Sequence, residues 1–248
     1  MLCLIDGDLV AYRCAATCKE DDPVDVALYR VDKLIREIIE AADCEEYQVW
    51  LTGSNNFRKE INPNYKANRK DMVPPVYLQD SREFLVTEHG AKLAHNMEAD
   101  DMLGINQTDG TIIASLDKDL LMIPGKHFNW IKQIFGDYTV VTEEMGWKHF
   151  WKQMLIGDTS DNIKGVAGLG PVKAGRLIDP LETNEECMEA VLSKYDDHDR
   201  FLINANCLWI MRSMDSIWHK DLGLTLPNEL QQEQDRLSKS IMSVREST

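Results

Sequence analysis

Apolar residues in the first half of the chain form short runs separated by longer stretches with helical periodicity. The short runs predict buried strands at residues 2–5, 47–51 and 111–115. Between the first two runs, apolar positions recur at three- and four-residue spacing over 24–42, which predicts an amphipathic helix. Weaker helical patterns cover 76–88 and 98–106. Strands that alternate with helices indicate an α/β core with a mainly parallel sheet.

The second half of the chain is predominantly helical by the same criterion. Candidate short strands occupy 127–131 and 138–141, and helical patterns cover 143–156, 185–215 and, as a polar tail, 228–242. Glycines punctuate the stretch at 157–176, and 53–75 is polar enough to predict an exposed excursion from the core.

The composition is that of a globular protein with a strongly negative charge. Hydrophobic residues make up 44% and charged residues 28% of the 248 positions. No apolar run reaches the roughly 20 residues of a membrane span, and the apolar start is too short for a signal peptide. The six cysteines have no metal-binding spacing, so we expect a cytoplasmic protein with reduced thiols. The formal net charge of −15 by itself disfavours a polyanionic partner, unless the charges are segregated.

Carboxylates are concentrated in four places. Asp6 and Asp8 follow the first predicted strand, and the other groups are E-A-D-D at 98–101, L-D-K-D at 116–119 and G-D-T-S-D at 157–161. Each group alone is typical of a turn, a loop or a solvated helix start. Two of the groups follow predicted strands, and the carboxyl ends of parallel strands form one edge of a sheet. Gathered carboxylates repel one another unless cations neutralise them. Hard divalent cations prefer such oxygen ligands, and two of them together assist phosphodiester hydrolysis.

Two segments are basic despite the acidic total. Residues 57–70 carry five basic residues against one acid, with aromatic residues interleaved, as in binding sites for single-stranded nucleic acid. Residues 163–176 read I-K-G-V-A-G-L-G-P-V-K-A-G-R, where three glycines precede a helix that starts at Pro171. Free N–H groups at such a helix start bind phosphate oxygens. A solvated loop and a plain packing loop are the respective alternatives.

In this order, the motifs resemble the structure-specific 5′ nucleases, which include flap endonucleases and the 5′→3′ exonuclease domain of bacterial DNA polymerase I. The likeness is strongest to the stand-alone exonucleases of T7-like phages and spans about residues 2–180. It is carried by L-I-D-G-D at 4–8, N-F-R-K-E at 56–60, P-N-Y-K-A-N-R-K at 63–70, E-A-D-D, S-L-D-K-D at 115–119, G-D-T-S-D-N-I at 157–163, and the hairpin from Gly165 to Ala174.

The resemblance implies a fold and a division of the chain. It implies an α/β, PIN-like or Rossmann-like core over residues 1–156, with a mainly parallel sheet and a short arch at about 53–80. A helical part would follow over residues 157–248, with a helix–hairpin–helix at about 160–180 and further C-terminal helices.

The resemblance also implies roles for individual residues. The family's metal-site carboxylates correspond to Asp6, Glu98, Asp100, Asp101, Asp117, Asp119, Asp158 and Asp161. Lys66 and Arg69 correspond to catalytic basic residues of the arch that steer the scissile phosphate. DNA contacts are expected from Arg58, Tyr65, Lys66, Arg69, Lys70, Lys164, Gly165, Gly168, Gly170, Lys173 and Arg176, with Tyr65 able to stack on a base. The implied cofactors are two Mg²⁺ or Mn²⁺ ions, and K⁺ at the helix–hairpin–helix.

The chain departs from the family pattern after the second predicted strand. The family carries an Asp there, whereas this chain reads W-L-T-G-S-N-N-F-R, with Thr52 or Gly53 at that position. Asp8 and Asp71 are the candidate replacements. The departure leaves the number of bound ions open.

The implied activity is that of a metal-dependent 5′→3′ exonuclease and 5′-flap endonuclease that hydrolyses phosphodiester bonds in DNA. It would act in phage-type DNA replication, primer removal or degradation of host DNA, in the host cytoplasm if the protein is phage-encoded. The expected partners are DNA with 5′ ends, flaps, nicks or branches, RNA–DNA hybrids, and a replication protein, but no membrane.

Two other functions compete with this one. L-I-D-G-D-L-V also resembles the D-x-D motif of haloacid-dehalogenase-type phosphatases, although that interpretation leaves E-A-D-D and the glycine-rich hairpin unexplained. Alternatively, the absent carboxylate near Gly53 marks a flap-DNA-binding relative that has lost catalysis.

Overall fold

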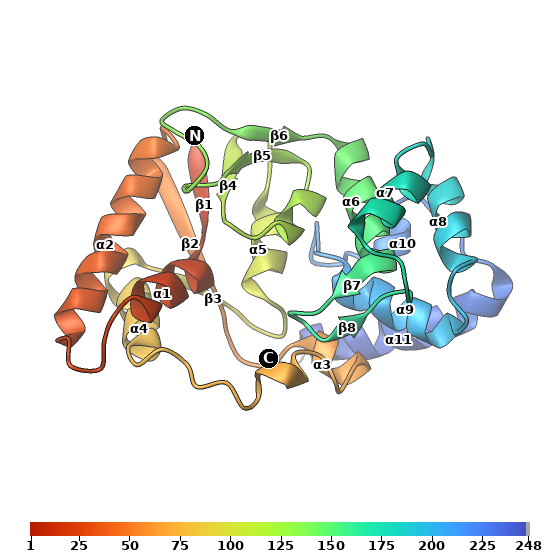
Figure 1. Cartoon of the computed structure of the whole chain (residues 1–248), viewed down its shortest axis with the longest axis horizontal. Helices are drawn as coiled ribbons and strands as arrows, with labels where there is room; N and C mark the ends of the chain where they lie inside the picture. The colour runs from red at the N-terminus through yellow and green to blue at the C-terminus, as the bar shows by residue number, and fades with distance from the viewer. Residues whose placement is uncertain (247–248) are drawn as a thin grey trace. The chain divides into compact units, whose positions relative to one another are not determined.

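The computed structural model describes residues 1–246, which form two compact units (Figure 1). Unit 1 comprises Met1–Ser54 and Val73–Val141, and unit 2 comprises Asn55–Met72 and the chain from Thr142 onward. Unit 1 therefore ends before residue 156, the expected end of the core, and part of the expected arch belongs to unit 2. None of the helices in residues 1–246 has the length and apolar character that crossing a membrane requires.

Unit 1 is built on a six-stranded, mainly parallel sheet in the order β3-β2-β1-β4-β5-β6. The strands are β1 (Leu2–Asp6), β2 (Glu46–Thr52), β3 (Lys92–Ala94), β4 (Thr111–Ala114), β5 (Gly125–Phe128) and β6 (Thr139–Val141). All neighbours pair in parallel except β5 and β6. The chain leaves β1 for β2 on one side and later adds β4 on the other. In α/β sheets, sites lie in the crevice expected at such a change of direction, which here is at the carboxyl ends of β1 and β4.

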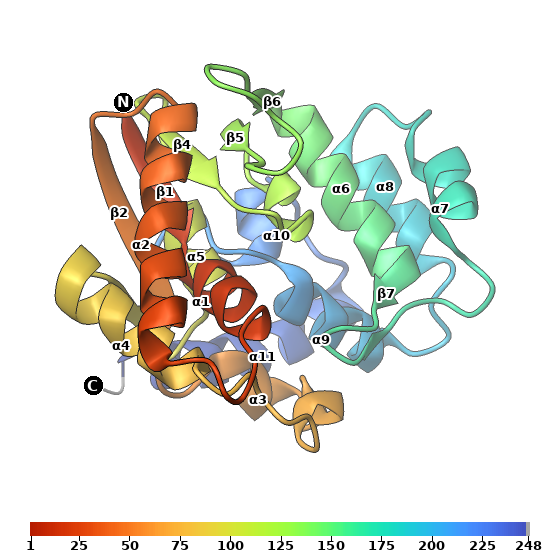
Figure 2. The ribbon, with the colours of Figure 1, turned by 60° about the vertical axis from the view of Figure 1, so that its left-hand side comes forward.

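Helices cover both faces of this sheet (Figure 2). They are α1 (Gly7–Ala16), α2 (Val24–Ala41) and α4 (Leu78–His89), which pack against one another, and α5 (Ala99–Asn106), which contacts β1, β2 and β3. Cys3 and Ile5 belong to the core formed with α1 and α2. Because side chains alternate along a strand, Leu4 and Asp6 point to the opposite face of the sheet.

The D-G-D sequence begins a helix rather than a turn. The Asp6 carboxylate accepts a hydrogen bond from Leu9 N (3.1 Å), so Asp6 both ends β1 and caps α1. Glycine at position 7 permits this close junction, since a Cβ there would lie 2.7 Å from the Trp50 carbonyl oxygen. The first predicted strand is therefore confirmed, but the turn after it is replaced by a helix.

Unit 2 is helical around an aromatic core. Its elements are α3 (Phe57–Ile61), the 3₁₀ helix η1 (Ala67–Arg69), α6 (Glu143–Ile156), β7 (Gly157–Asp158), β8 (Ile163–Lys164), α7 (Pro171–Ile178), α8 (Asn184–Leu192), α9 (His198–Leu208), α10 (Trp218–Asp221) and α11 (Asn228–Glu246). The pattern at 185–215 resolves into α8 and α9, because Asp197 caps a new helix through Asp199 N and Arg200 N. The rings of Phe150, Trp151 and Trp218 pack with centroids 4.9–6.1 Å apart.

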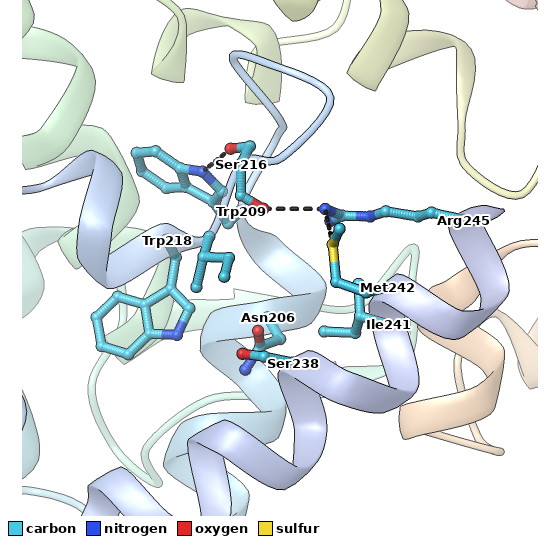
Figure 3. Close-up of a pocket in the computed structure, with 9 residues that line it drawn as sticks. Asn206, Trp209, Ser216, Trp218, Ser238, Ile241, Met242 and Arg245 are labelled. Carbon is cyan, nitrogen blue, oxygen red and sulfur yellow. Dashed lines mark hydrogen bonds between the residues drawn. The ribbon is translucent and has the colours of Figure 1, made fainter.

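Helix α11 completes this core instead of forming a polar tail (Figure 3). Arg245 donates to the Ser216 carbonyl oxygen (3.0 Å), and Trp209 Nε1 donates to Ser216 Oγ (3.2 Å). Gln234, which is fully buried on α11, accepts from Trp218 Nε1 (3.0 Å). The cavity that remains beside these residues measures about 10 Å³, which is at most the space of one water molecule.

Strands β7 and β8 form a tight hairpin that depends on glycine. A Cβ at Gly165 would lie 2.4 Å from Gly157 N and 2.4 Å from the Leu155 carbonyl oxygen. We expect Gly165→Ala to lower the free energy of unfolding by about 1–3 kcal/mol in urea denaturation, because backbone atoms must move. Gly170→Ala is the matched control, since a Cβ at Gly170 meets no atom within 4 Å, and it should stay within about 0.5 kcal/mol. Equal losses in the two variants would contradict the steric explanation.

Candidate functional site

Asp6 is a buried carboxylate at the carboxyl end of the central strand β1. Asp6 is only 3% exposed, and its Oδ2 accepts a hydrogen bond from Ser115 Oγ (2.8 Å) just after β4. The pKa of Asp6 is raised to about 7, chiefly by burial and also by the negative charges of Asp8 and Asp117, while its hydrogen bonds to Leu9 N and Ser115 lower the pKa. Asp6 thus lies where a positive charge would stabilise it most.

Ser115 connects Asp6 to the carboxylates that follow β4. Ser115 Oγ accepts from Asp117 N (3.0 Å), and Asp117 Oδ1 accepts from Asp119 N (2.9 Å). Asp117 comes close enough to Asp6 to influence its pKa. The expected association of the first and third acidic groups is therefore present in unit 1. The sequence motif S-L-D-K-D contains Ser115 but assigns it no role, because the sequence around a single serine does not show which distant residue it bonds.

Glu98 and Asp101 form a reciprocal cap at the start of α5. The Glu98 side chain accepts from the backbone N–H of Asp101, and Asp101 Oδ2 accepts from Glu98 N (3.0 Å). Glu98 is 8% exposed, Asp101 is fully buried, and Asp100 is partly exposed. The sequence E-A-D-D thus shapes a helix start as well as presenting carboxylates.

Thr52 takes a structural role at the end of β2, where the family pattern has an acid. Its Oγ1 accepts from Ala99 N (3.0 Å), which attaches α5 to the sheet. Its backbone N–H donates to Asp8 Oδ2 (2.9 Å), so the Asp8 carboxylate lies beside the end of β2. Arg82 forms an ion pair with Asp8 and donates to the Thr52 carbonyl oxygen. Of the two candidate replacements, Asp8 lies beside the end of β2 and is paired with Arg82, while Asp71 belongs to unit 2.

Within residues 1–246, no group of three or more His, Cys, Asp or Glu side chains is arranged to hold a metal ion. The carboxylates of unit 1 come together instead as hydrogen-bonded or electrostatically coupled pairs. Their chemistry still fits a hard divalent cation, because Asp6 and Asp117 offer oxygen donors, and the pKa of Asp6 is raised by burial first and by the neighbouring negative charges second.

In unit 2, Asp161 is the centre of a cluster with the basic segment. Tyr65 Oη donates to Asp161 Oδ2 (2.8 Å), and Asp161 Oδ1 forms ion pairs with Arg69 (2.8 Å) and Lys66 (3.6 Å). Asp158 Oδ1 accepts from Ser160 N (2.7 Å) in the same turn. Lys66 and Arg69 are thus both held beside an acid, although Arg69 remains exposed.

Tyr65 does not have the exposure expected of a base-stacking residue. It is 3% exposed, and its hydroxyl is engaged by Asp161. In the DNA-free protein Tyr65 therefore positions Asp161, and its stacking on DNA stays a prediction.

Arg58 is likewise a buried structural residue. It is 2% exposed, and its guanidinium donates to the carbonyl oxygens of Cys207 (2.8 Å) and Trp209 (2.8 Å) at the end of α9. In the DNA-free protein its donors are used inside unit 2, and a contact of Arg58 with DNA stays a prediction. Phe57 and Ile61, four residues apart and both buried, are the sequence signal that this part of the excursion packs as a helix.

The basic residues of the glycine-rich hairpin remain at the surface. Lys164, Lys173 and Arg176 are exposed, and Lys173 Nζ donates to the Gly168 carbonyl oxygen (2.9 Å). The Lys173 ammonium group therefore bonds one backbone carbonyl of the hairpin at which the family resemblance implies a K⁺ ion. Helix α7 begins at Pro171 as predicted. Lys70 of the other basic segment is exposed as well.

A family model described as the 5′-3′ exonuclease, N-terminal resolvase-like domain matches residues 1–153. The chain belongs to this family. The match confirms the resemblance drawn from the motifs, and nothing in it supports the phosphatase interpretation.

Curated relatives agree with the family match. The exodeoxyribonuclease of Enterobacteria phage T3 is 31% identical over 177 residues, which cover 67% of this chain and 56% of that protein. The exonuclease of Escherichia phage T7 is 34% identical over 144 residues, covering 54% of this chain and 47% of that protein. The flap endonuclease Xni of Shewanella putrefaciens is 26% identical over 198 residues, covering 73% and 74%. The matched region spans about half the length of the two phage relatives.

Solved structures confirm the predicted fold. The T5 D15 protein co-crystallised with metal ions superposes with a TM-score of 0.60 at 16% identity, covering 98% of both chains. A complex of the Rad2 catalytic core with DNA gives a TM-score of 0.52 at 12% identity, covering 98% of this chain and 91% of that one. The α/β core of the PIN-like type with a helical second part is thus the fold of this chain.

Proposed function

We propose that this chain is a divalent-cation-dependent 5′→3′ exonuclease and 5′-flap endonuclease acting on DNA. Membership of the 5′-3′ exonuclease family supports this, as do relatives named exonucleases and flap endonucleases. The observation that carries the proposal is Asp6, whose carboxylate is buried at the crevice beside β4 with a pKa raised to about 7. Such a group needs a cation to act as a carboxylate at neutral pH.

In unit 1, Asp6 and Asp117 would hold Mg²⁺ or Mn²⁺, with Glu98, Asp100, Asp101 and Asp119 as the further proposed ligands. Divalent ions at such a site supply an activated water and stabilise the leaving oxygen. Ser115 orients both Asp6 and the backbone at Asp117. Asp8 contributes negative charge near Asp6 while Arg82 balances it.

In unit 2, we propose that Lys66 and Arg69 bind phosphate. Their charges are balanced by Asp161 in the DNA-free protein. A phosphate group accepts hydrogen bonds from the same donors, so these side chains exchange one anionic partner for another. Asp158 and Asp161 are the remaining proposed metal ligands; Asp158 ends β7, and Asp161 lies in the turn between β7 and β8.

The glycine-rich hairpin is the proposed contact with duplex DNA. Lys70, Lys164, Lys173 and Arg176 are exposed cations, and backbone N–H groups at the start of α7 suit phosphate oxygens. Gly165, Gly168 and Gly170 allow the backbone to approach the strand. Contacts of this kind position DNA without reading its sequence. The proposal also includes RNA–DNA hybrids as substrates and a K⁺ ion bound at the hairpin. It further places the protein in the cytoplasm.

The decisive experiment measures cleavage of 5′-flap, nicked and blunt duplexes with Mg²⁺ and with EDTA. We expect cleavage only with Mg²⁺, and a loss of at least about 10³-fold in the Asp100→Asn, Asp117→Asn double variant, because the negative oxygen donors are removed. Asp109→Asn, an exposed acid on the loop before β4, is the matched control and should cleave like the wild type.

Three results would contradict the proposal. One is full cleavage by the double variant, and another is hydrolysis of small phosphomonoesters without cleavage of DNA. The third is tight flap binding by the wild type with no cleavage in either Mg²⁺ or Mn²⁺.

A further inference from the structure

Unit 2 contains an open polar pocket that the proposed metal ligands do not use. Its volume is about 460 Å³, within the range of sites for small ligands. Segments from three elements line it: the residues after α3, the strand β8 and the first turns of α9. Figure 1 shows α3, β8 and α9 close together.

One wall of the pocket is held rigidly by amide side chains. Asn162 Nδ2 donates to the Asn64 carbonyl oxygen (2.8 Å). Asn204 Nδ2 donates to the carbonyl oxygen of Lys164 (2.9 Å) and to Tyr195 Oη (3.0 Å). Tyr195 Oη in turn donates to the Met154 carbonyl oxygen (2.6 Å), so it must accept from Asn204. Both amide hydrogens of Asn204 are therefore used, and this fixes the orientation of its amide.

Asn204 consequently presents an acceptor that a ligand can use. The residue is 4% exposed and lines the pocket, and its Oδ1 receives no hydrogen bond from any residue between 1 and 246. A buried acceptor of this kind is stabilised when an N–H or O–H group reaches it. Ile163 and Ile203 supply apolar surface beside it.

Two cationic residues, Lys164 and Arg200, line the same pocket together with the acids Asp197 and Asp199. Arg200 is anchored by hydrogen bonds to the Gly165 carbonyl oxygen (3.3 Å) and to Asp196 (2.7 Å), and it stacks on the Tyr195 ring. Lys164 is exposed and has no ion-pair partner in the described part of the chain. Asp197, at the rim, has one carboxylate oxygen engaged in capping α9.

We propose that this pocket binds a single unpaired nucleotide. Its phosphate would contact Lys164 and Arg200, and its base would cover Ile203 and donate an N–H to Asn204 Oδ1. Every base carries such an N–H, so the pocket would tolerate all four. The proposal rests on the proposed function, which makes nucleic acid the substrate. The nucleotide is either part of the substrate strand or a released mononucleotide.

The test uses the full chain with the four deoxynucleoside 5′-monophosphates and with a four-nucleotide single strand. Calorimetry gives the dissociation constants, and NMR follows the side-chain amide signals of Asn162 and Asn204. Ile203→Trp fills the pocket, and we expect it to weaken binding at least tenfold. Met214→Trp, at an exposed site of unit 2 outside the pocket, is the matched control and should bind like the wild type.

Arg200→Gln leaves the pocket open, so it tests the pocket independently in case the Ile203→Trp variant misfolds. We expect it also to weaken binding about tenfold, by removing a charged hydrogen bond to phosphate. Binding of the free monophosphates identifies a product site, and binding of the strand alone identifies a substrate site. Both results support the pocket.

Two results would overturn the inference. The first is that neither ligand moves the Asn162 and Asn204 signals at millimolar concentration, which corresponds to about −4 kcal/mol of binding. The second is that Ile203→Trp and Met214→Trp bind equally well. Nucleotide binding by a wild type that cleaves no DNA would instead refute the proposed function and leave the pocket standing.

Discussion

Replacing Asp6 with Asn should make the metal-free protein more stable at alkaline pH while abolishing cleavage. Asp6 is 3% exposed, and burial raises its pKa to about 7. In the unfolded chain an Asp has a pKa of about 4. Between about pH 4 and pH 7 the folded state therefore binds one more proton than the unfolded state. The free energy of unfolding therefore falls as the pH rises through this window. Above it, the buried charge costs about 3–4 kcal/mol.

The measurement is calorimetric melting of wild type and Asp6→Asn in EDTA on both sides of this window. We expect equal stability below about pH 4 and a gain for the variant above about pH 7. Asn still offers Oδ1 to Leu9 N, so the cap of α1 survives. Asp109→Asn, an exposed substitution, should melt like the wild type at every pH. A variant that is less stable than the wild type above the window would show that burial does not dominate.

Adding a divalent cation should change the melting temperatures of the wild type and Asp6→Asn by different amounts. Mg²⁺ or Mn²⁺ is expected to raise the melting temperature of the wild type above the window, because ligand binding stabilises the folded state. Asp6→Asn should respond much less, since it lacks the ionised oxygen donor. An equal rise in both proteins would place the cation elsewhere. This readout does not depend on catalytic activity.

Replacing Arg58 with Ala should lower the free energy of unfolding of unit 2. The main effect of the substitution should therefore be on stability and not on DNA binding alone. The guanidinium is 2% exposed and holds the Cys207 and Trp209 carbonyl oxygens at the end of α9. Its removal leaves buried acceptors and a cavity, which together cost about 3–5 kcal/mol. The change is measured as the shift of the urea midpoint at constant slope.

Lys59 is the matched control, because it is the neighbouring basic residue of α3 and is exposed. Lys59→Ala should change the free energy of unfolding by less than about 0.5 kcal/mol. An Arg58→Ala protein with unchanged stability and weakened DNA affinity would restore the DNA-binding role expected from the sequence.

The acidic net charge does not conflict with a phosphate-containing partner, because of where the charges lie. In unit 1, the charges of Asp8 and Asp117 raise the pKa of Asp6, and Arg82 forms an ion pair with Asp8. In unit 2, Asp161 is balanced by Lys66 and Arg69, while the basic residues of the hairpin stay exposed. The carboxylates are thus gathered or compensated, and cations remain available to bind phosphate.

The sequence by itself determined the strands β1, β2 and β4, the helices α2, α4 and α5 and the location of the first acidic pair, but not β3 or the helix α1. A buried strand needs a short apolar run, so β1, β2 and β4 were visible, and a parallel sheet places their carboxyl ends at one edge. The motifs also determined the family, since their order along the chain does not depend on packing.

Only the tertiary structure decided what each charged side chain contacts. Arg58, Lys66 and Arg69 lie in one basic segment, yet Arg58 is buried against α9 while the other two pair with Asp161. Arg82 joins Asp8 across 74 residues of sequence. Local periodicity sets the face of an element on which a residue lies, but the partner of a charge depends on which distant segment packs there. That choice belongs to the whole fold, because a buried charge is stable only where the surrounding chain supplies its hydrogen bonds.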